Sequence, residues 1–403
     1  MKPIISYLFL LLIVLSGSNV RAQQFTNYTS ANGLPSDNVN GVAVDASNHK
    51  WFATQAGVAR FDNTTWTTYT TANGLIDNYI NCIAVDVNNN VWAGTDYGAS
   101  KFDGTTWTSY NAANGLANNT VNYMAGDPDG SVWIGTGNGL SRFNGTTWTN
   151  YSTANGLPSN LISYIAVDQT GNKWFGTFLG GLSKFNGTSF TNFTVADSLP
   201  DNNIISIGIG ANNTKWIGTY FGVAVFDNLD QWIGTYRVAD GLLNDFVQDI
   251  AMDSKGTMWF GLYDIYLQEG GITSKNANVW KSFTVASGLV NNVVKRIAVD
   301  KSDIVWITTG GGVSKLFDPT SGFGNLSGMT LSAFPNPATT EIHLDGLTTF
   351  GNLWIMTLTG KTVVSQALSK GSNTISLNGL SSGNYIMKYT TGMISYTGKL
   401  VIR

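Results

Sequence analysis

Short runs of β-branched and aromatic residues alternate with clusters of Gly, Asn, Asp and Ser along most of the chain. One stretch shows the pattern well, with four runs reading VNYMAGD (121–127), SVWIGTG (131–137), GLSRFN (139–144) and TWTNYS (147–152). Runs of this composition between turn-forming residues predict β-strands. No window places apolar residues at helical spacing over three or more turns. The pattern therefore predicts an all-β protein with a unit of four strands, called A to D.

This unit repeats from residue 25 to residue 317. A tryptophan in strand B marks each copy, at Trp51, Trp92, Trp133, Trp174, Trp216, Trp259 and Trp306. Four strands in about 41 residues, repeated, are typical of a β-propeller blade. The last copy lacks strand D, but residues 25–28 (FTNY, followed by SANGL) align with residues 66–69 (WTTY, followed by TANGL). We therefore predict a seven-bladed β-propeller that is closed by an N-terminal strand, which leaves no sheet edge exposed.

The recurring residues have structural explanations. The tryptophans are expected to fill the space between blades, because large aromatics dominate core burial. The Gly of each Asn-Gly-Leu motif is expected to have a positive φ, and the Asp or Asn four residues later is expected to bond nearby backbone. Asp129 and Gly130 faintly resemble a calcium loop but lack its other ligands, so an Asx turn is favoured. The sequence indicates no metal site and no cofactor.

Composition and targeting signals narrow the class of protein. Only 12% of the residues are charged and the net charge is −3, which argues against nucleic-acid binding. Residues 1–22 have the features of a secretory signal peptide, with Lys2, an apolar run, and small residues before Gln23. No later apolar stretch is long enough to span a bilayer. Cys82 is the single cysteine and is expected in the core.

The repeat ends after Phe317, and residues 319–330 are interpreted as a linker. Residues 331–403 contain six or seven short strand-like runs, which suit a small Ig-like β-sandwich. Three segments, AFPNPAT (333–339), LSSGNY (380–385) and KLVIR (399–403), resemble the type A sorting domain of the type IX (Por) secretion system. The motif residues are Phe334, Pro335, Asn336, Pro337, Gly383, Asn384, Tyr385 and Lys399.

This resemblance implies a bacterium of the Bacteroidota and export by the type IX machinery. It also implies removal of the domain by a sortase-type peptidase, with the protein then released or attached to surface lipopolysaccharide. The expected domains are therefore a signal peptide (1–22), the propeller (23–318), the linker (319–330) and the sorting domain (331–403). The expected location is secreted or on the outer cell surface.

The repeats resemble the two-component regulator propeller, whose units have an Asp-turn-Trp-x-Gly-Thr pattern followed by Gly-Leu. Residues 168–177 (DQTGNKWFGT) and 127–136 (DPDGSVWIGT) carry it. In that family such propellers form periplasmic sensors of hybrid histidine kinases and are associated with glycan sensing. This chain has no kinase domain and one ring rather than two, so the resemblance implies a ligand-binding propeller only.

A binding site is expected on the face formed by the B–C loops and the D-to-A crossings, at positions that differ between copies. Aromatics gather there, and the sixth copy is enlarged by the insertion YDIYLQEGG (263–271). Deeper in the channel, the second residues of the A strands form a polar ring that is expected to hold water. The candidate ligand-binding residues are Tyr79, Tyr97, Phe178, Tyr220, Phe221, Phe246, Asp249, Tyr263, Tyr266, Lys295 and Arg296.

Three functions fit these features. The favoured hypothesis is a secreted or surface-attached module that binds a glycan or a peptide. The alternatives are a lyase or hydrolase that uses carboxylates of this face, and a surface interaction scaffold. The chain loosely resembles the seven-bladed streptogramin lyases in the form of its repeat. However, it contains only two His and two Glu, and of these only Glu269 falls near the expected site. An Asp pair, for instance Asp249 with Asp245, is an alternative for catalysis, but no spacing argues for it.

Overall fold

The computed structural model describes residues 24–317, 333–347, 350–357, 361–391 and 394–403. The expected signal peptide and the expected linker lie outside these residues. The chain divides into two compact units, with the division after Gly322.

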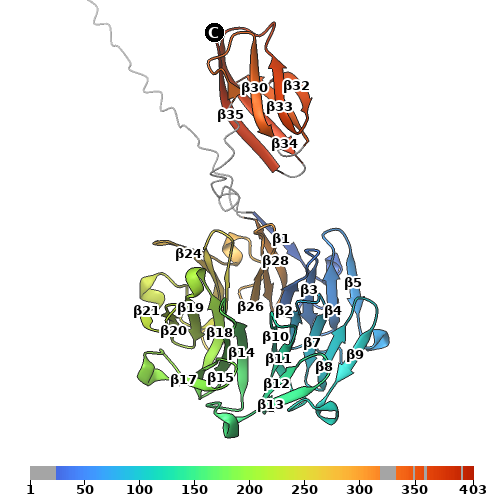
Figure 1. Cartoon of the computed structure of the whole chain (residues 1–403), viewed down its shortest axis with the longest axis vertical. Helices are drawn as coiled ribbons and strands as arrows, with labels where there is room; N and C mark the ends of the chain where they lie inside the picture. Colours follow the sequence, from blue (N-terminus) through green and yellow to red (C-terminus); the bar gives the residue numbers. More distant parts are fainter. Residues whose placement is uncertain (1–23, 318–332, 348–349, 358–360, 392–393) are drawn as a thin grey trace, which may run out of the picture. The chain divides into compact units, whose positions relative to one another are not determined.

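The first unit contains seven four-stranded antiparallel sheets among its described residues (Figure 1). Sheets one to three consist of β2 (Val39–Val44), β3 (Lys50–Thr54), β4 (Gly57–Phe61), β5 (Trp66–Tyr69); β6 (Cys82–Val85), β7 (Val91–Thr95), β8 (Gly98–Phe102), β9 (Trp107–Tyr110); and β10 (Val121–Gly126), β11 (Val132–Thr136), β12 (Gly139–Phe143), β13 (Trp148–Tyr151). Sheets four to six consist of β14 (Ile162–Val167), β15 (Lys173–Thr177), β16 (Gly181–Phe185), β17 (Phe190–Phe193); β18 (Ile204–Ile209), β19 (Lys215–Thr219), β20 (Gly222–Phe226), β21 (Trp232–Tyr236); and β22 (Val247–Met252), β23 (Met258–Asp264), β24 (Glu269–Asn276), β25 (Val279–Phe283).

Sheet seven joins the two ends of this unit. It consists of β26 (Val294–Val299), β27 (Val305–Thr309), β28 (Gly312–Phe317) and the N-terminal strand β1 (Gln24–Tyr28). β1 runs antiparallel to β28, with Tyr28 opposite Val313 and Gln24 opposite Phe317. The first strands of neighbouring sheets contact one another in the cyclic order β2, β6, β10, β14, β18, β22, β26 and back to β2. The predicted closure by the N-terminal strand is therefore confirmed.

The repeated tryptophans lie in the core between sheets, as predicted. Trp133 is 1% exposed and belongs to a cluster with Phe175 and Phe185 of sheet four. Its indole Nε1–H donates to Asp127 Oδ2 at 2.9 Å, and Asp127 directly follows β10. The same bond joins Trp and Asp in six of the seven sheets, whereas in sheet five the acceptor is Thr214 Oγ1. The repeated Asp thus satisfies a buried indole donor in addition to forming its turn.

The crossings between sheets use the predicted turn chemistry. Each contains a short 3₁₀ helix: η1 (Ser30–Asn32), η2 (Thr71–Asn73), η3 (Ala112–Asn114), η4 (Thr153–Asn155), η5 (Val195–Asp197), η7 (Val238–Asp240) and η8 (Val285–Ser287). Gly115 ends η3 with φ 111°, and a Cβ there would come 2.7 Å from Trp148 Cδ1. Asn119 Oδ1 accepts the Ala112 N–H at 2.8 Å, which fixes the start of the helix. Equivalent bonds occur at all seven crossings. A further 3₁₀ helix, η6 (Ala211–Asn213), forms the turn between β18 and β19.

The second residue of most first strands lies at a β-bulge. In sheet one the register shifts between Val39 and Gly41, so Asn40 is unpaired and points toward sheet two. Asn40 Nδ2 donates to Ile80 O at 2.8 Å, and Asn122 Nδ2 donates in the same way to Ile162 O at 2.9 Å. A bulge re-aims a side chain in this manner. Residues of the polar ring that we expected to hold water therefore join sheet one to sheet two and sheet three to sheet four.

Buried ion pairs lie at the opposite end of the first strands. Lys50 is 1% exposed, and its Nζ lies 3.0 Å from Asp300 Oδ2, which joins sheet one to sheet seven. Lys173 and Asp127 join sheets four and three at 2.8 Å. The Lys50 ammonium also lies 5.0 Å from the centre of the Trp306 ring. Each of these lysine charges is thus neutralised by a carboxylate inside the fold.

The second unit contains two antiparallel sheets. The strands β29 (Ala333–Phe334), β30 (Glu341–Leu347) and β33 (Gly371–Ser376) form one sheet. The strands β32 (Thr362–Leu368), β31 (Gly351–Thr357), β34 (Gly383–Thr391) and β35 (Ile394–Ile402) form the other. Ile342 and Ile375 of the first sheet share one buried cluster with Leu353 and Leu400 of the second. The unit is therefore a small two-layered β fold.

Candidate functional site

A pocket of about 470 Å³ opens at the end of the ring where the first strands begin. Five sheets contribute to it through the first strands, the crossings before them and the loops between second and third strands. Its lining residues are Asn40, Tyr79, Asn81, Tyr220, Phe246, Gln248, Tyr263, Ile265, Val293, Val294, Lys295 and Arg296. We call it the mouth pocket. The expected face of the ring therefore does contain a concave site.

Aromatic side chains form much of the wall of the mouth pocket. The ring centroids of Tyr220 and Phe246 lie 5.1 Å apart, and those of Phe246 and Tyr266 lie 6.1 Å apart. On sheet two, the Tyr79 hydroxyl accepts a hydrogen bond from Gln55 Nε2 at 3.0 Å. Phe246 thus contacts both Tyr220 and Tyr266, and Gln55 fixes the Tyr79 hydroxyl.

The insertion in sheet six has a different structure from the one expected. We expected residues 263–271 to form a loop, but β23 and β24 extend as a hairpin, with Asp264 opposite Glu269. Only residues 265–268 lie in the turn between them. Asp264 Oδ1 accepts the N–H groups of Tyr266 and Leu267 at 2.7 and 3.1 Å, which shapes the tip. Strand pairing with Gly270 therefore places Tyr263 in the pocket wall.

The basic residues of the mouth pocket are Lys295 and Arg296, both on β26. Lys295 occupies the bulge position of sheet seven. Its ammonium donates to Asn40 Oδ1 at 2.7 Å and also to Asn38 Oδ1, both on the sheet-one side. Burial, with a smaller contribution from the Arg296 charge, lowers the pKa of Lys295 to about 8.

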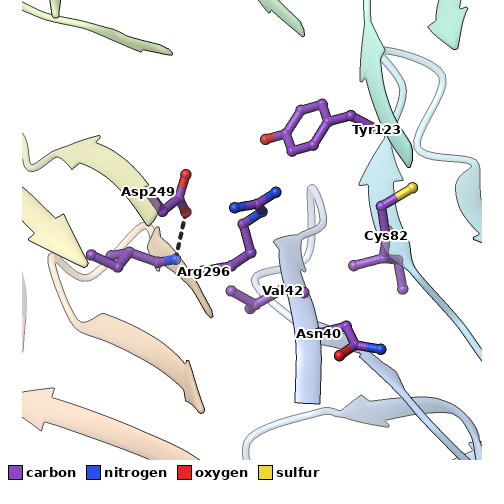
Figure 2. A pocket seen from close by; sticks show the side chains of 9 residues that line it. Asn40, Val42, Cys82, Tyr123, Asp249 and Arg296 are labelled. Atoms are coloured by element: carbon purple, nitrogen blue, oxygen red, sulfur yellow. Dashed lines mark hydrogen bonds between the residues drawn. The ribbon is translucent and has the colours of Figure 1, made fainter. Parts of the chain in front are cut away.

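A second cavity, of about 30 Å³, shares Asn40 and Arg296 with the mouth pocket (Figure 2). The Arg296 guanidinium lies 5.3 and 5.4 Å from the ring centres of Tyr123 and Tyr164, and these two rings stack with centroids 4.0 Å apart. Asp249 is 2% exposed; it accepts from the Tyr164 hydroxyl at 2.7 Å and from the Ile297 N–H at 2.7 Å. Side chains from four different sheets thus converge on the channel.

The electrostatics of this cluster favour a structural role. Burial raises the pKa of Asp249, and the Arg296 charge opposes that rise. Burial, reinforced by the Asp249 charge, raises the pKa of both Tyr123 and Tyr164. Burial also raises the pKa of the Cys82 thiol to about 12, so the thiol stays protonated near neutral pH. Cys82 is buried, as predicted.

The structure brings together some of the predicted ligand-binding residues and leaves others outside. The residues that line the mouth pocket are Tyr79, Tyr220, Phe246, Tyr263, Lys295 and Arg296. Asp249 lines the smaller cavity instead. The residues that line neither are Tyr97, Phe178, Phe221 and Tyr266. Tyr97, Phe221 and Tyr266 are strongly exposed, which places them on the surrounding surface.

Sequence reasoning missed the pairing of Tyr123 with Tyr164. Both are the third residue of a first strand, and the other copies have Gly41, Cys82, Ser206, Asp249 and Arg296 at that position. The strong variation of this one position within a regular repeat was the signal in the sequence that could have identified these residues. The residues at this position meet across the channel because each first strand faces the centre of the ring.

The candidates for catalysis have structural partners. His49 Nδ1 lies 2.8 Å from Asp45 Oδ2 in the turn between β2 and β3. Asp245 Oδ1 accepts the Val238 N–H at a crossing, whereas its proposed partner Asp249 lies in the channel. Among the described residues, no group of three or more His, Cys, Asp or Glu side chains is arranged to hold a metal ion.

In the second unit, the three sorting motifs meet, because Gly383, Asn384 and Tyr385 of β34 lie opposite Ile402, Val401 and Leu400 of β35. Asn336 Oδ1 accepts the Val401 N–H at 2.9 Å, and Ala338 exchanges backbone hydrogen bonds with Val401 and Arg403. Phe334 packs on His343, while Pro335 and Pro337 flank Asn336. Gly383, Asn384 and Tyr385 open β34, where the Tyr385 hydroxyl donates to Ser381 O at 2.8 Å; Lys399 lies in β35. The opening motif therefore holds the last strand of the unit.

Family models match both units. The model of the two component regulator propeller matches residues 74–97, 115–138 and 241–264. The model of the secretion system C-terminal sorting domain matches residues 332–403. Among curated proteins, none matches the chain.

Solved structures share the fold at low sequence identity. The chain is similar to the extracellular domain of a B. thetaiotaomicron protein described as a hybrid two component system (18% identity, TM-score 0.66, 94% of this chain and 57% of that one). It is also similar to PorZ, a surface component of the type-IX secretion system of Porphyromonas gingivalis (16% identity, TM-score 0.61, 91% of this chain and 60% of that one). The chain thus spans less than two thirds of the length of either. A streptogramin B lyase is covered over 97% of its length, at 12% identity and TM-score 0.61.

The fold and these matches define the class: the first unit is a β-propeller. The chain carries two component regulator propeller repeats followed by a type IX sorting domain, so it is exported to the medium or to the outer surface. No helix among the described residues is long and apolar enough to cross a membrane.

Proposed function

We propose that the chain is a secreted or surface-attached binding protein whose mouth pocket holds a glycan or a peptide. In this proposal the seven sheets are the blades of a seven-bladed propeller (23–318). A signal peptide (1–22) precedes it, and a linker (319–330) and an Ig-like sorting domain (331–403) follow. The type IX machinery exports the chain, and a sortase-type peptidase removes the sorting domain.

One observation carries the proposal. The mouth pocket is built from Tyr79, Tyr220, Phe246 and Tyr263 at positions that differ between copies, whereas the repeated residues are occupied in holding the sheets together. Pockets of a few hundred cubic ångströms with aromatic walls and a few polar groups are typical ligand sites. Aromatic faces stack on sugar rings or grip peptide side chains, and the amides of Asn81 and Gln248 supply polar contacts.

The pocket lining and one structural neighbour support binding more than catalysis. A similar fold with a bound peptide occurs in YCF48 with the D1 peptide (13% identity, TM-score 0.56). Virginiamycin B lyase from Staphylococcus aureus is catalytically inactive when a histidine is replaced by alanine. In the present chain the two histidines are His49, in an inter-strand turn, and His343, in the second unit. The lining of the mouth pocket contains neither histidine nor carboxylate.

A glycan array with the purified protein tests the proposal, followed by a Tyr220→Ala plus Tyr263→Ala variant. Loss of binding in this variant is the expected result, because both rings line the pocket. Tyr97→Ala is the matched control, because Tyr97 is an exposed aromatic outside the pocket. Binding that survives the double substitution would place the site elsewhere. Absence of binding to both glycans and peptides would favour the scaffold alternative.

A further inference from the structure

Lys295 differs from the other residues at its position in the ring. The bulge residues of the other first strands are uncharged, namely Asn40, Asn122, Ser163, Ile205 and Gln248. Four of them donate to backbone carbonyl groups, as Asn40 does to Ile80. Lys295 instead places an ammonium group at the mouth of the channel. The repeat therefore requires no charge at this point.

Lys295 also differs from the buried lysines of the opposite face. Lys50, Lys173 and Lys215 each pair with an aspartate carboxylate within 3.0 Å. None of the ion pairs formed among the described residues includes Lys295. Its partners are the amide oxygens of Asn38 and Asn40, which carry no charge. A partly buried cation without a counter-charge is costly and favours an anion from outside.

The acidic groups around the pocket have other partners. Asp249 is bonded to Tyr164 and Ile297 in the second cavity, where its charge faces that of Arg296. Asp96 Oδ1 accepts from Asn81 Nδ2 at 2.9 Å, and Asp264 caps the hairpin turn of sheet six. Arg296 is thus balanced from within the fold, whereas the Lys295 charge remains for a ligand.

We propose that the mouth pocket binds an acidic oligosaccharide, with a uronate carboxylate paired to the Lys295 ammonium and sugar rings packed on Tyr220, Phe246 and Tyr263. This proposal rests on the proposed function and gives its ligand a chemical class. The amides of Asn40, Asn81 and Gln248 lie in the same lining and can bond sugar hydroxyls. A peptide made only of Asp and Glu has no ring to stack on these aromatic faces, whereas each sugar ring of an acidic oligosaccharide presents an apolar face to them, which favours the sugar.

Isothermal titration of the full chain with tetragalacturonate tests the proposal, with the same oligosaccharide reduced at its carboxyl groups as the neutral probe. We expect the reduced probe to bind at least tenfold more weakly. Lys295→Gln is expected to weaken tetragalacturonate binding at least tenfold and to leave the reduced probe unaffected. Lys281→Gln, which removes the same charge from the exposed face of outer strand β25, is expected to change neither.

The possible outcomes separate the two proposals. Equal binding of both probes, abolished by the Tyr220→Ala plus Tyr263→Ala substitutions, would overturn the acidic-ligand proposal and keep the binding function. Binding of tetraglutamate without binding of tetragalacturonate would overturn the sugar assignment in favour of a peptide. If neither sugar probe nor the peptide bound, the acidic-ligand proposal would fail, whereas the binding function would fail only if the glycan array and peptides were negative as well. Circular dichroism of each variant, matching the unaltered protein, ensures that lost binding reflects the site.

Discussion

The two ends of β26 carry lysine contacts of opposite kinds. Near its start, at the mouth pocket, the Lys295 ammonium contacts only amide oxygens. Just after its end, the Asp300 carboxylate binds both the Lys50 ammonium and the Trp306 indole. The Asp300 end closes the ring between sheets seven and one, and its carboxylate and the Lys50 ammonium neutralise each other. The Lys295 end leaves a charge without a counter-ion.

The difference between the two ends of β26 distinguishes residues that hold the sheets together from residues that are available to a ligand. Where the repeat is kept, as in the Asp–Trp bonds and the crossing turns, polar groups are satisfied within the fold. Where a copy departs from the repeat, as at Lys295, Tyr123 and Tyr164, the residues face the channel or the pocket. Substitutions at the Asp300 end of β26 should therefore lower the stability of the fold. Substitutions at the Lys295 end should instead weaken ligand binding.

The largest expected effect is on stability, at Asp300. Asp300→Ala leaves the Lys50 ammonium unpaired in the core and is expected to lower the free energy of unfolding by ~3–5 kcal/mol. Asp253→Ala is the matched control, because Asp253 accepts from the Trp259 indole and from backbone N–H groups of its own turn but forms no ion pair with a described lysine ammonium, and it is expected to cost about 1–3 kcal/mol. Urea denaturation followed by tryptophan fluorescence measures both. Equal losses would mean that the ion pair adds nothing.

Replacing the two lysines themselves gives the direct contrast. Lys50→Met leaves the buried Asp300 without its cation and is expected to cost ~3 kcal/mol of unfolding free energy. Lys295→Met removes a partly buried charge that has no carboxylate partner, so a change of less than about 1 kcal/mol is expected. The urea midpoints of unfolding of the two variants measure both free-energy losses. A large loss at Lys295 would show that its amide contacts hold sheets seven and one together.

A smaller effect is expected inside the channel. Tyr164→Phe removes the hydroxyl that donates to Asp249 and is expected to lower the unfolding free energy by about 1–2 kcal/mol. Ligand binding at the mouth pocket should not change, because Tyr164 does not line it. Thermal unfolding and titration of one preparation measure both quantities. Weakened binding would show that the channel cluster positions Arg296 for the ligand.

The smallest effect concerns pH. Desolvation disfavours the charged form of Lys295, so its pKa of about 8 lies below the usual value for a lysine and the proton is lost as pH rises through 8. Its titratable neighbours are Arg296, Asp249, Tyr79, Tyr220 and Tyr263, and burial raises the pKa of Tyr220. Affinity for tetragalacturonate is therefore expected to fall roughly tenfold between about pH 6.5 and 9.5. Titration at both pH values should show no such fall in Lys295→Gln.

Much of the fold follows from local chemistry that the sequence displays openly. The spacing of the tryptophans, the Asn-Gly-Leu corners and the likeness of residues 25–28 to 66–69 were enough to predict the sheets and the pairing of β1 with β28. Six of the predicted ligand-binding residues line the mouth pocket, because the loops and strand ends that differ between copies lie at one end of the ring. The hairpin of sheet six was missed, because a strand extension and a loop insertion look alike in a sequence.

The sequence by itself determined the repeat, the turn chemistry and the sorting domain, because each depends on residues that are close along the chain. Only the tertiary structure decided which distant residues meet. Lys50 pairs with Asp300, and Tyr164 with Asp249, across a ring that brings together residues far apart in the chain. Such contacts depend on where each sheet places its first strand around the axis, and no local pattern encodes that placement.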